Sequence, residues 1–199
     1  MIIPVERGIL DASSLQICVD ALRKGEMICY PTETFYALGV DELNEQALLR
    51  LYTVKQRQVE KQLPLIASDI AMVATVCDTA DSRFAALAGK FWPGPLTLVL
   101  PSIDRSKSYA IRVSSQPVAR QLAQAFGSPL VSTSANRSGY PPAIDSHLLS
   151  ESIKQAVAIL IEGGPSPGGL PSTIVSLLQR PGKVIRQGAI SQTELVSLL

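Results

Sequence analysis

Hydroxyl-bearing and basic residues follow two neighbouring elements near the start of the chain. The apolar run Met27–Tyr30 precedes the turn Pro31–Thr34, and a later helical pattern ends at Lys55 and Arg57, with Lys61 just beyond. Hydroxyls are small neutral donors and acceptors, whereas a lysine and an arginine at one helix end can converge on an anion. A solvated helix end is the plainer alternative for these cations. The pattern predicts a pocket for a small polar molecule beside a phosphate group.

Two arginines elsewhere lie within or after predicted strands. Arg112 falls in an apolar strand pattern, where a structural ion pair and a substrate carboxylate explain a cation equally well. Arg186 ends another strand pattern, where a surface position is the plainer interpretation. If Arg186 converges with the helix-end cations, each pair repels by up to about 4 kcal/mol at an effective dielectric of roughly 20. Because Glu33 is the one carboxylate nearby, a bound polyphosphate is a better candidate partner than an internal ion pair.

A polar loop, Thr133–Asn136, follows a further predicted strand. Its hydroxyl, amide and backbone N–H groups could bind phosphate or carboxylate oxygens, although such residues are also common in ordinary turns. No Walker A sequence and no G-x-G-x-x-G pattern follows a strand, so a nucleotide would bind without either glycine-rich loop. His147 is the single histidine, which argues against a histidine-dependent triad and favours catalysis by positioning and electrostatics.

Composition favours a globular chain with a substantial core. The chain has 199 residues, is 46% hydrophobic and has a mean hydropathy of +0.22, so one domain spanning residues 1–199 is expected. No apolar run is long enough to span a bilayer and no signal-peptide pattern is present, which predicts a cytoplasmic protein with no membrane partner. A net charge of +1 leaves any nucleic-acid affinity to local clusters of cations. The three separated cysteines predict reduced buried thiols and no structural zinc.

Helical periodicity and capping residues predict the helices. The ranges are Ser13–Lys24, Asn44–Lys55, Asp69–Val76, Asp81–Phe91, Pro117–Phe126 and a short helix that begins at the capping box Ser191–Glu194. Ser13 or Ser14 is the expected N-cap of the first helix, and Asn44 is that of the second.

Apolar runs bounded by turn residues predict the strands. They are Met27–Tyr30, Leu63–Ala67, Leu96–Leu100, Tyr109–Val113, Pro129–Ser132, Ala156–Ile161, Ser172–Leu177 and Lys183–Arg186. The third and fourth should pair antiparallel, the last two should form a hairpin, and Pro64 should mark an edge or a bulge. The fold class is therefore α/β, an open twisted sheet of mixed parallel and antiparallel strands with flanking helices. Polar loops that follow strands mark where ligands collect in such sheets.

Seven motifs occur together in an order that resembles the YrdC-like threonylcarbamoyl-AMP synthases. They are Tyr30–Gly39 (YPTETFYALG), Lys55–Arg57 (KQR), Trp92–Thr97 (WPGPLT), Ile111–Val113 (IRV), Ser134–Gly139 (SANRSG), Gly163–Pro165 (GGP) and Ser172–Val175 (STIV). The resemblance covers nearly the whole chain. The resemblance implies the YrdC-like fold, an open twisted sheet with a concave basic cleft.

The resemblance also implies an enzyme, a nucleotidyltransferase that condenses L-threonine, bicarbonate and ATP into threonylcarbamoyl-adenylate and releases pyrophosphate. Threonine would first form a carbamate, whose oxygen attacks the α-phosphorus of ATP. Mg²⁺ would bridge phosphate oxygens and needs few protein ligands, so no protein-held metal site is expected. Partner proteins would move the threonylcarbamoyl group onto the adenosine next to the anticodon of certain tRNAs, and tRNA is a further candidate ligand.

Site residues are implied position by position, where the motifs match. Lys55 and Arg57 would be catalytic and stabilise charge on the phosphates. The threonine pocket would contain Thr32, Arg112, Ser132 and Ser172. The nucleotide would be bound by Arg57, Lys61, Ser134, Asn136 and Arg186. Four residues depart from the family pattern, and none belongs to this set: Ala37, Gln62, Pro171 and Gln187.

Two other functions stay open on the residues alone. The same basic concavity could hold RNA without chemistry, although 5% aromatic residues leave little for base stacking. A paralogous carbamoyl or adenylyl transferase could act on a different substrate, although the intact Lys-x-Arg and Ser-x-Asn motifs argue against it. Threonine-dependent release of pyrophosphate from ATP discriminates the synthase from the RNA-binding module, and a thermal-shift panel across amino acids with ATP tests the paralogous transferase.

Overall fold

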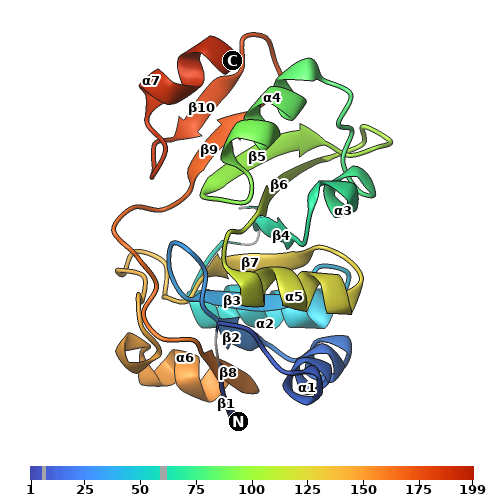
Figure 1. Cartoon of the computed structure of the whole chain (residues 1–199). Coiled ribbons are helices and arrows are strands. Elements are labelled where there is room, and N and C mark those ends of the chain that lie inside the picture. Colours follow the sequence, from blue (N-terminus) through green and yellow to red (C-terminus); the bar gives the residue numbers. More distant parts are fainter. Residues whose placement is uncertain (6–7, 59–61) are drawn as a thin grey trace.

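This computed structural model describes residues 1–5, 8–58 and 62–199. The described residues form one ten-stranded sheet with helices around it (Figure 1). The strands are β1 (Ile2–Pro4), β2 (Ile28–Tyr30), β3 (Ala37–Asp41), β4 (Leu65–Ala67), β5 (Leu96–Pro101), β6 (Ser108–Val113), β7 (Leu130–Ser134), β8 (Ile159–Glu162), β9 (Thr173–Ser176) and β10 (Lys183–Arg186). Their order across the sheet is β1-β8-β2-β3-β7-β4-β6-β5-β9-β10.

The sheet mixes both kinds of strand pairing. The pairs β1–β8, β8–β2, β4–β6 and β5–β9 are parallel, and the remaining five are antiparallel. The predicted antiparallel neighbours β5 and β6 and the closing hairpin β9–β10 are both present. The predicted fold class, an α/β open mixed sheet, is therefore confirmed, whereas the extent of the domain stays a prediction.

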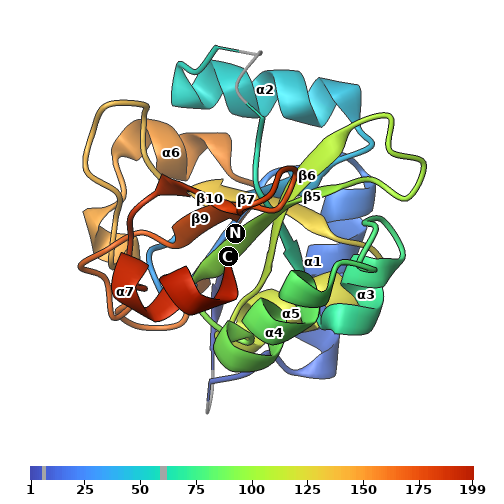
Figure 2. The same ribbon diagram turned by 90° about the horizontal axis from the view of Figure 1, so that it is seen from above.

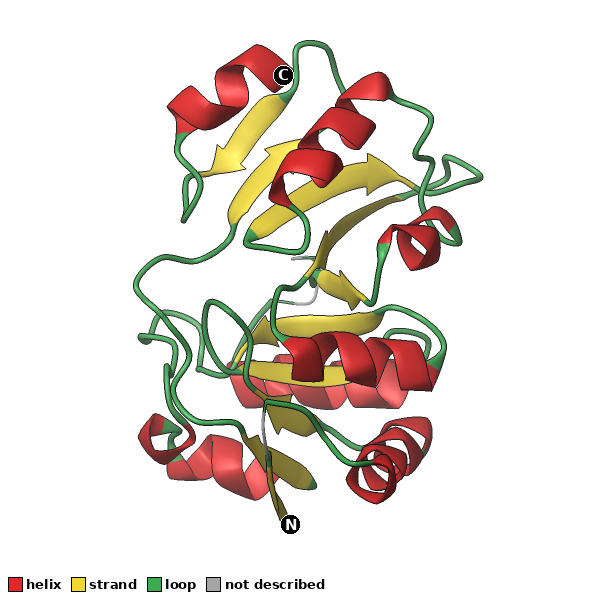
Figure 3. Ribbon diagram, in the orientation of Figure 1, coloured by secondary structure: helices red, strands yellow, loops and turns green. Residues whose placement is uncertain are grey.

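Helices cover the sheet on both sides (Figure 3). They are α1 (Ala12–Arg23), α2 (Glu45–Lys55), α3 (Ile70–Ala74), α4 (Ser82–Phe91), α5 (Pro117–Phe126), α6 (Glu151–Ala156) and α7 (Gln192–Leu195). Asn44 caps α2, and Ser191 forms the predicted capping box of α7. No helix in the described ranges is long and apolar enough to cross a membrane.

The register of the strands sorts their side chains onto two faces, because paired residues of neighbouring strands point the same way. One face supplies Leu38, Leu98 and Ile111 to a large apolar cluster that also contains residues of α2, α3, α4, α6 and α7. The opposite face supplies Ile28 and Leu130 to a smaller cluster that contains residues of α1 and α5. Figure 2 shows α2 and α6 on one side of the strands and α1 and α5 on the other.

The smaller cluster stops short of one end of the sheet. None of its described members lies on β5, β6, β9 or β10. On the opposite face, the same four strands except β10 contribute fully buried residues to the large cluster, and Val184 of β10 packs against it. The second face of these strands is therefore left for polar side chains, and the candidate site lies there.

Several local predictions were wrong for physical reasons. Asp11, not Ser13 or Ser14, caps α1, because its carboxylate accepts hydrogen bonds from the backbone N–H groups of both serines. Pro64 does not mark an edge, since β4 lies between β7 and β6, and Pro64 precedes it. The strand predicted for Ala156–Ile161 starts too early. Residue 156 is the last residue of α6, and β8 begins at residue 159.

Two strands of the sheet, β1 and β3, were not predicted from the sequence. β1 is a three-residue edge strand, and β3 contains Gly39 in its middle. Glycine weakens a strand, but here the backbone passes close to an aromatic ring. A Cβ atom at Gly39 would lie 2.6 Å from Cε1 of Tyr30, so a side chain at this position would push the tyrosine aside.

Candidate active site

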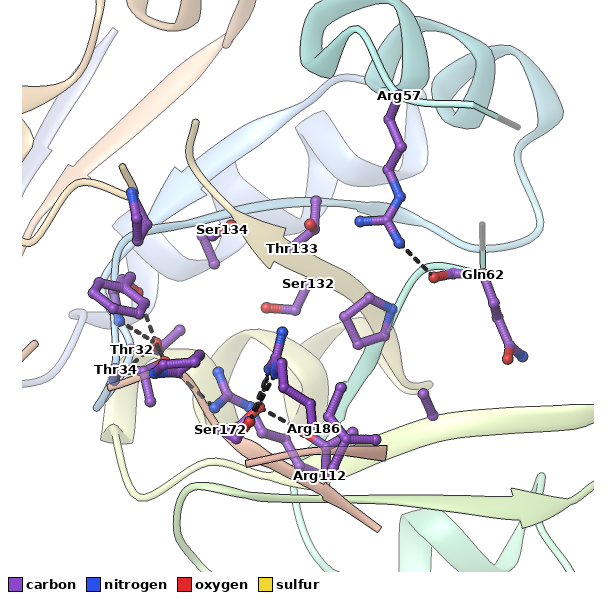
Figure 4. A pocket seen from close by; sticks show the side chains of 18 of the residues that line it. Thr32, Thr34, Arg57, Gln62, Arg112, Ser132, Thr133, Ser134, Ser172 and Arg186 are labelled. Carbon is purple, nitrogen blue, oxygen red and sulfur yellow. Dashed lines mark hydrogen bonds between the residues drawn. The ribbon is translucent and has the colours of Figure 1, made fainter. Parts of the chain in front are cut away.

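A cavity of about 460 Å³ lies against the uncovered face of β5, β6, β9 and β10 (Figure 4). Its polar lining comes from Thr32, Thr34, Arg57, Gln62, Thr97, Arg112, Ser132, Thr133, Ser134, Ser172 and Arg186. We call it the arginine cavity, because three of these residues are arginines and no described lining residue is acidic. A concave site with one sign of charge attracts an anionic ligand.

Strand register explains why these side chains meet. Thr97 of β5 pairs with Ile174 of β9, and both line the arginine cavity. Leu98 pairs with Ile111 of β6, and both are buried in the large apolar cluster on the opposite face. Arg112 follows Ile111, so the alternation of side chains along β6 points it into the cavity.

A β-bulge in β10 brings Arg186 to the same cavity. Val184 pairs with Val175 of β9, so an uninterrupted ladder would place Ile185 opposite Ile174. The register shifts after Val184, and Arg186 takes the position opposite Ile174 instead. Ile185 remains 56% exposed. A bulge commonly re-aims a side chain in this way beside a functional site.

Arg112 is held from behind by a carboxylate. Its Nη1 donates to Oε1 of Glu33 at 2.9 Å and lies 3.4 Å from Oγ1 of Thr34. The hydroxyl of Ser114 donates to the other carboxylate oxygen of Glu33. Among the described residues Glu33 pairs with Arg112 and not with Lys55 or Arg57, so an internal ion pair exists beside the proposed anion site. Both side chains of the pair are about nine-tenths buried.

Arg186 donates to a residue that was also predicted to be in the site. Its Nη2 donates to the carbonyl oxygen of Ser172 at 2.8 Å and to Oγ of Ser172 at 3.1 Å. That hydroxyl lies 2.9 Å from Oγ1 of Thr97. Burial, and then the charges of Arg112 and Arg57, lower the pKa of Arg186. Arg186 is therefore repelled by the other two arginines, and an anionic ligand would relieve this repulsion.

Arg57 reaches the cavity from the segment that follows α2. Its Nη2 donates to the carbonyl oxygen of Gln62 at 2.9 Å. Its Nε is buried and has no hydrogen-bond partner among the described residues. The buried hydroxyl of Ser132 lies beside the phenol of Tyr30 but also lacks a hydrogen bond of good geometry among the described residues. Unpartnered polar atoms in the wall of a cavity are costly unless a ligand or water satisfies them, so both are candidate ligand contacts.

The hydroxyl of Thr32 is used within its own turn. Oγ1 of Thr32 donates to the carbonyl oxygen of Phe35 at 2.6 Å and accepts from the N–H groups of Thr34 and Phe35. Oγ1 of Thr34 lies 3.1 Å from it and completes the turn. Thr32 therefore shapes the wall of the cavity, while Thr34 extends from that wall towards Arg112.

A second cavity, of about 550 Å³, adjoins the first and contains the lysine. Lys55 is 2% exposed, and its Nζ donates to the carbonyl oxygens of Ser134 at 2.5 Å and Asn136 at 2.8 Å. Burial, and then the charge of Arg57, lower the pKa of Lys55 to about 8. We call this second cavity the lysine cavity. Its lysine ammonium is bound to the loop after β7 and repelled by the neighbouring guanidinium.

The loop after β7 is held by its own side chains. Oγ of Ser134 donates to Oδ1 of Asn136 at 2.5 Å. Nδ2 of Asn136 donates to the carbonyl oxygens of Arg137 at 2.9 Å and Tyr140 at 2.6 Å. Together with the bonds from Lys55, these contacts fix the backbone at the mouth of the lysine cavity.

The predicted site residues meet, but not in the predicted partition. Lining the arginine cavity are Thr32, Arg57, Arg112, Ser132, Ser134, Ser172 and Arg186. Lining the lysine cavity are Lys55, Arg57, Ser134 and Asn136. Arg57 and Ser134 belong to both cavities. Arg186, predicted for the nucleotide, lies with the residues predicted for threonine, and Lys61 falls outside the described residues.

Sequence reasoning missed part of the wall. Thr97 interrupts an apolar strand with a polar side chain on the cavity face, which is a signal that could have been used. Glu33 is 79 residues from Arg112 in sequence, and Ser114 is close to Arg112 in sequence but contacts Glu33. No local sequence pattern reveals these contacts. Three of the departures from the family pattern line the arginine cavity: Ala37, Gln62 and Pro171. The fourth, Gln187, donates to the carbonyl oxygen of Ile190.

The amino-acid sequence of this chain is similar to a known protein family and to named members of it. The Sua5-YciO-YrdC family model, described as "Telomere recombination", matches residues 20–188. A threonylcarbamoyl-AMP synthase of Vibrio cholerae is 41% identical over 187 residues, covering 88% of this chain and 97% of that protein. A threonylcarbamoyl-AMP synthase of Chromohalobacter salexigens is 38% identical over 184 residues, covering 88% of this chain and 98% of that protein.

Solved structures agree with the fold. The structure of Pyrococcus abyssi Sua5 complexed with L-threonine matches with a TM-score of 0.91 and 28% identity, covering 100% of this chain and 61% of that one. Escherichia coli YciO matches with a TM-score of 0.85 and 24% identity, covering 96% of this chain and 97% of that one, which bears on the fold alone. With a matching family model over most of its length and relatives above one-third identity, the chain belongs to the Sua5-YciO-YrdC family.

Proposed function

We propose that this chain is a threonylcarbamoyl-AMP synthase, which condenses L-threonine, bicarbonate and ATP and releases pyrophosphate. The observation that carries the proposal is the pair of adjoining cavities that share Arg57 and Ser134. Two substrates bound side by side could react across the shared wall, since holding reactants together removes much of the entropic barrier. The synthases of Vibrio cholerae and Chromohalobacter salexigens carry the same activity in their names.

The arginine cavity is the proposed site of threonine. Arg112 has donors beyond Nη1 with which to meet a carboxylate, and guanidinium groups suit carboxylates geometrically. The hydroxyls of Thr34, Ser132 and Ser172 lie in the same wall and suit the hydroxyl and amine of the amino acid. The structure of a Sua5 protein with L-threonine supports this class of ligand.

The nucleotide is proposed to lie along the lysine cavity, with its phosphates directed towards the shared wall. Lys55 and Arg57 supply positive charge there, and Ser134 and Asn136 supply a fixed polar loop. Arg186 adds a cation from the adjoining arginine cavity. The threonine amine takes up CO₂ from bicarbonate and forms a carbamate with loss of water. A carbamate oxygen then forms a bond to the α-phosphorus, the bond from that phosphorus to the bridging oxygen breaks, and pyrophosphate leaves. The cations stabilise the charge on the phosphates.

Magnesium is proposed to enter with ATP. The described residues contain no cluster of three histidine, cysteine or acidic side chains, and Glu33 is already paired with Arg112. The hydroxyl and basic residues of the two cavities would hold the phosphates of the nucleotide, and the ion would arrive with those phosphates and need few protein ligands. When bound, the ion would neutralise part of the phosphate charge.

The later steps of the pathway are proposed from the same chemistry. The adenylate is a mixed anhydride and needs a partner protein to pass its threonylcarbamoyl group to the adenosine next to the anticodon of tRNA. We place this work in the cytoplasm, where ATP and tRNA are available. The basic residues around the arginine cavity could also contact tRNA phosphates, and this contact would weaken steeply with salt.

Pyrophosphate release tests the proposed function. The chain should release pyrophosphate from ATP with bicarbonate only when threonine is present, and Lys55→Met should reduce the rate by about a hundredfold because a charge beside the phosphates is lost. Lys154, whose side chain is 34% exposed and pairs with Glu151 at the surface, offers the matched control Lys154→Met. Release that is independent of threonine, or near-normal release by Lys55→Met, would contradict the assignment.

Binding discriminates the alternative functions. A selective amino acid at 100 times its dissociation constant should stabilise the chain by about 2.7 kcal/mol in thermal unfolding with ATP present. Threonine should give the largest shift in a panel with serine, valine and allothreonine. Equal shifts would favour a transferase with another substrate, and a shift with single-stranded RNA alone would favour an RNA-binding module.

A further inference from the structure

Glu33 sits behind Arg112 rather than in the arginine cavity. Arg112 lines the cavity and Glu33 does not, yet Nη1 of the arginine and Oε1 of the glutamate are 2.9 Å apart. The exposed fractions of the two side chains are 10% and 9%. The carboxylate therefore accepts a hydrogen bond from the edge of the guanidinium group and lies outside the lining of the arginine cavity.

Glu33 is itself held in place from the start of α5. Oγ of Ser114 donates to Glu33 Oε2, and the same hydroxyl accepts from the backbone N–H of Gln116, the N-cap residue of α5. Thr34, next to Glu33, lies 3.4 Å from the same Nη1. The orientation of Arg112 is thus set by a chain of contacts that ends in the backbone of a helix.

The charges explain why such an arrangement matters. Arg57, Arg112 and Arg186 all line the arginine cavity, and no described lining residue is acidic. Glu33 is the carboxylate that the structure records in contact with one of these arginines. It offsets the charge of Arg112 and leaves Arg57 and Arg186 without a carboxylate among the recorded ion pairs of the described residues. A polyphosphate carries several charges and prefers the unbalanced pair, whereas a single carboxylate can be bound by the balanced arginine.

We propose that Glu33 is a positioning residue that divides the arginine cavity into a carboxylate subsite at Arg112 and a phosphate subsite at Arg57 and Arg186. It does so by orienting Arg112 and by offsetting its charge, which keeps phosphate groups out of the amino-acid subsite. The inference rests on the proposed function for the identity of the carboxylate. The offset of charge is independent of it.

The test uses the full chain and compares four variants. Glu33→Gln removes the charge, Glu33→Asp keeps the charge but withdraws it from Arg112, and Ser114→Ala releases Glu33 without touching Arg112. Glu26→Gln is the matched control, because Glu26 forms a surface pair with Arg50 at 3.5 Å. Each variant is measured for thermal stability, for inorganic pyrophosphate affinity by calorimetry, and for the KM of threonine and kcat in pyrophosphate release from ATP.

Glu33→Gln should change the two ligands in opposite directions. The KM of threonine should rise about tenfold with kcat changed less than about twofold, while pyrophosphate should bind about tenfold more tightly and compete with threonine. Glu33→Asp should raise the KM of threonine but leave pyrophosphate affinity within about twofold of the wild type. Ser114→Ala should show a weaker form of the Glu33→Asp result, and Glu26→Gln should show no change.

The contrary results are distinct. Unchanged pyrophosphate affinity in Glu33→Gln would overturn the charge offset, and weakening of both ligands together with the melting temperature would show that Glu33 acts through packing alone. Identical behaviour of Glu33→Asp and Glu33→Gln would overturn the separation of geometry from charge. If the wild type shows no response to threonine, the proposed function fails, but the pyrophosphate comparison still decides whether Glu33 governs anion affinity.

Discussion

The two faces of β5, β6 and β9 contrast sharply. Leu98, Ile111 and Val175 lie on one face, are fully or almost fully buried, and belong to the large apolar cluster. Thr97 and Arg112, next to them in sequence, lie on the other face and line the arginine cavity. The same strands therefore carry the core and the candidate site one residue apart.

The difference follows from which face the helices cover. Apolar side chains on the covered face gain burial against α3, α4 and α7, which stabilises the fold. On the uncovered face Arg112 is buried and Arg186 is exposed, and the charge of Arg112 helps to lower the pKa of Arg186. Stability and activity should therefore separate by face, and variants of neighbouring residues can test this.

The largest effect is expected for the cavity face. Arg186→Met should reduce threonine-dependent pyrophosphate release by about 10²–10³-fold, the usual cost of losing a group that stabilises transition-state charge. Its melting temperature should stay the same or rise, because repulsion with Arg112 and Arg57 is removed. Steady-state kinetics and thermal unfolding measure both. A lowered melting temperature with near-normal kinetics would reverse the assignment of the two faces.

The opposite pattern is expected one residue from Arg112. Ile111→Ala should lower the free energy of unfolding by about 3 kcal/mol, through lost burial and a residual cavity in the core. Denaturant titration measures this change. The KM values of threonine and ATP, measured below the melting temperature, should match the wild type. Altered KM values with unchanged stability would mean that the core face also shapes the site.

A smaller effect concerns the pH dependence of stability. The pKa of Lys55 is lowered to about 8 from 10.5, so between these values the unfolded chain binds more protons than the folded chain. The free energy of unfolding should therefore rise with pH across this window, by about 2 kcal/mol from pH 8 to pH 10 relative to Lys55→Met. Chemical denaturation at both pH values measures the difference. Parallel pH profiles for the two proteins would show that burial of Lys55 carries no such penalty.

Local signals predicted much of the fold. The helix Pro117–Phe126, the Asn44 cap and the hairpin of β9 and β10 depend on residues close in sequence, and each was found where expected. β3 was missed because Gly39 has a tertiary role, the accommodation of the Tyr30 ring. Local propensity contains no information about that contact.

The sequence predicted which residues belong to the candidate site, but not which of them contact one another. The motifs identified Arg112 and Arg186, because strand cations and family resemblance point to them directly. They could not reveal that Glu33 pairs with Arg112 across 79 residues, since that contact depends on how the strands are ordered. They also could not reveal that Arg186 shares a cavity with the predicted threonine residues.

The bulge in β10 gives strand pairing a chemical role. With a period of two, a regular strand would turn Arg186, two residues after Val184, to the core side. The bulge leaves Ile185 out of the ladder and so turns Arg186 to the cavity side. Deletion of Ile185 would remove the bulge and leave Arg186 opposite Ile174 on the cavity side, whereas pairing of Ile185 in a regular ladder would direct the guanidinium group towards the core side. In this hairpin the location of a charge is specified by which residue stays unpaired, so a one-residue alignment gap at Ile185 would leave Arg186 on the same side of the sheet.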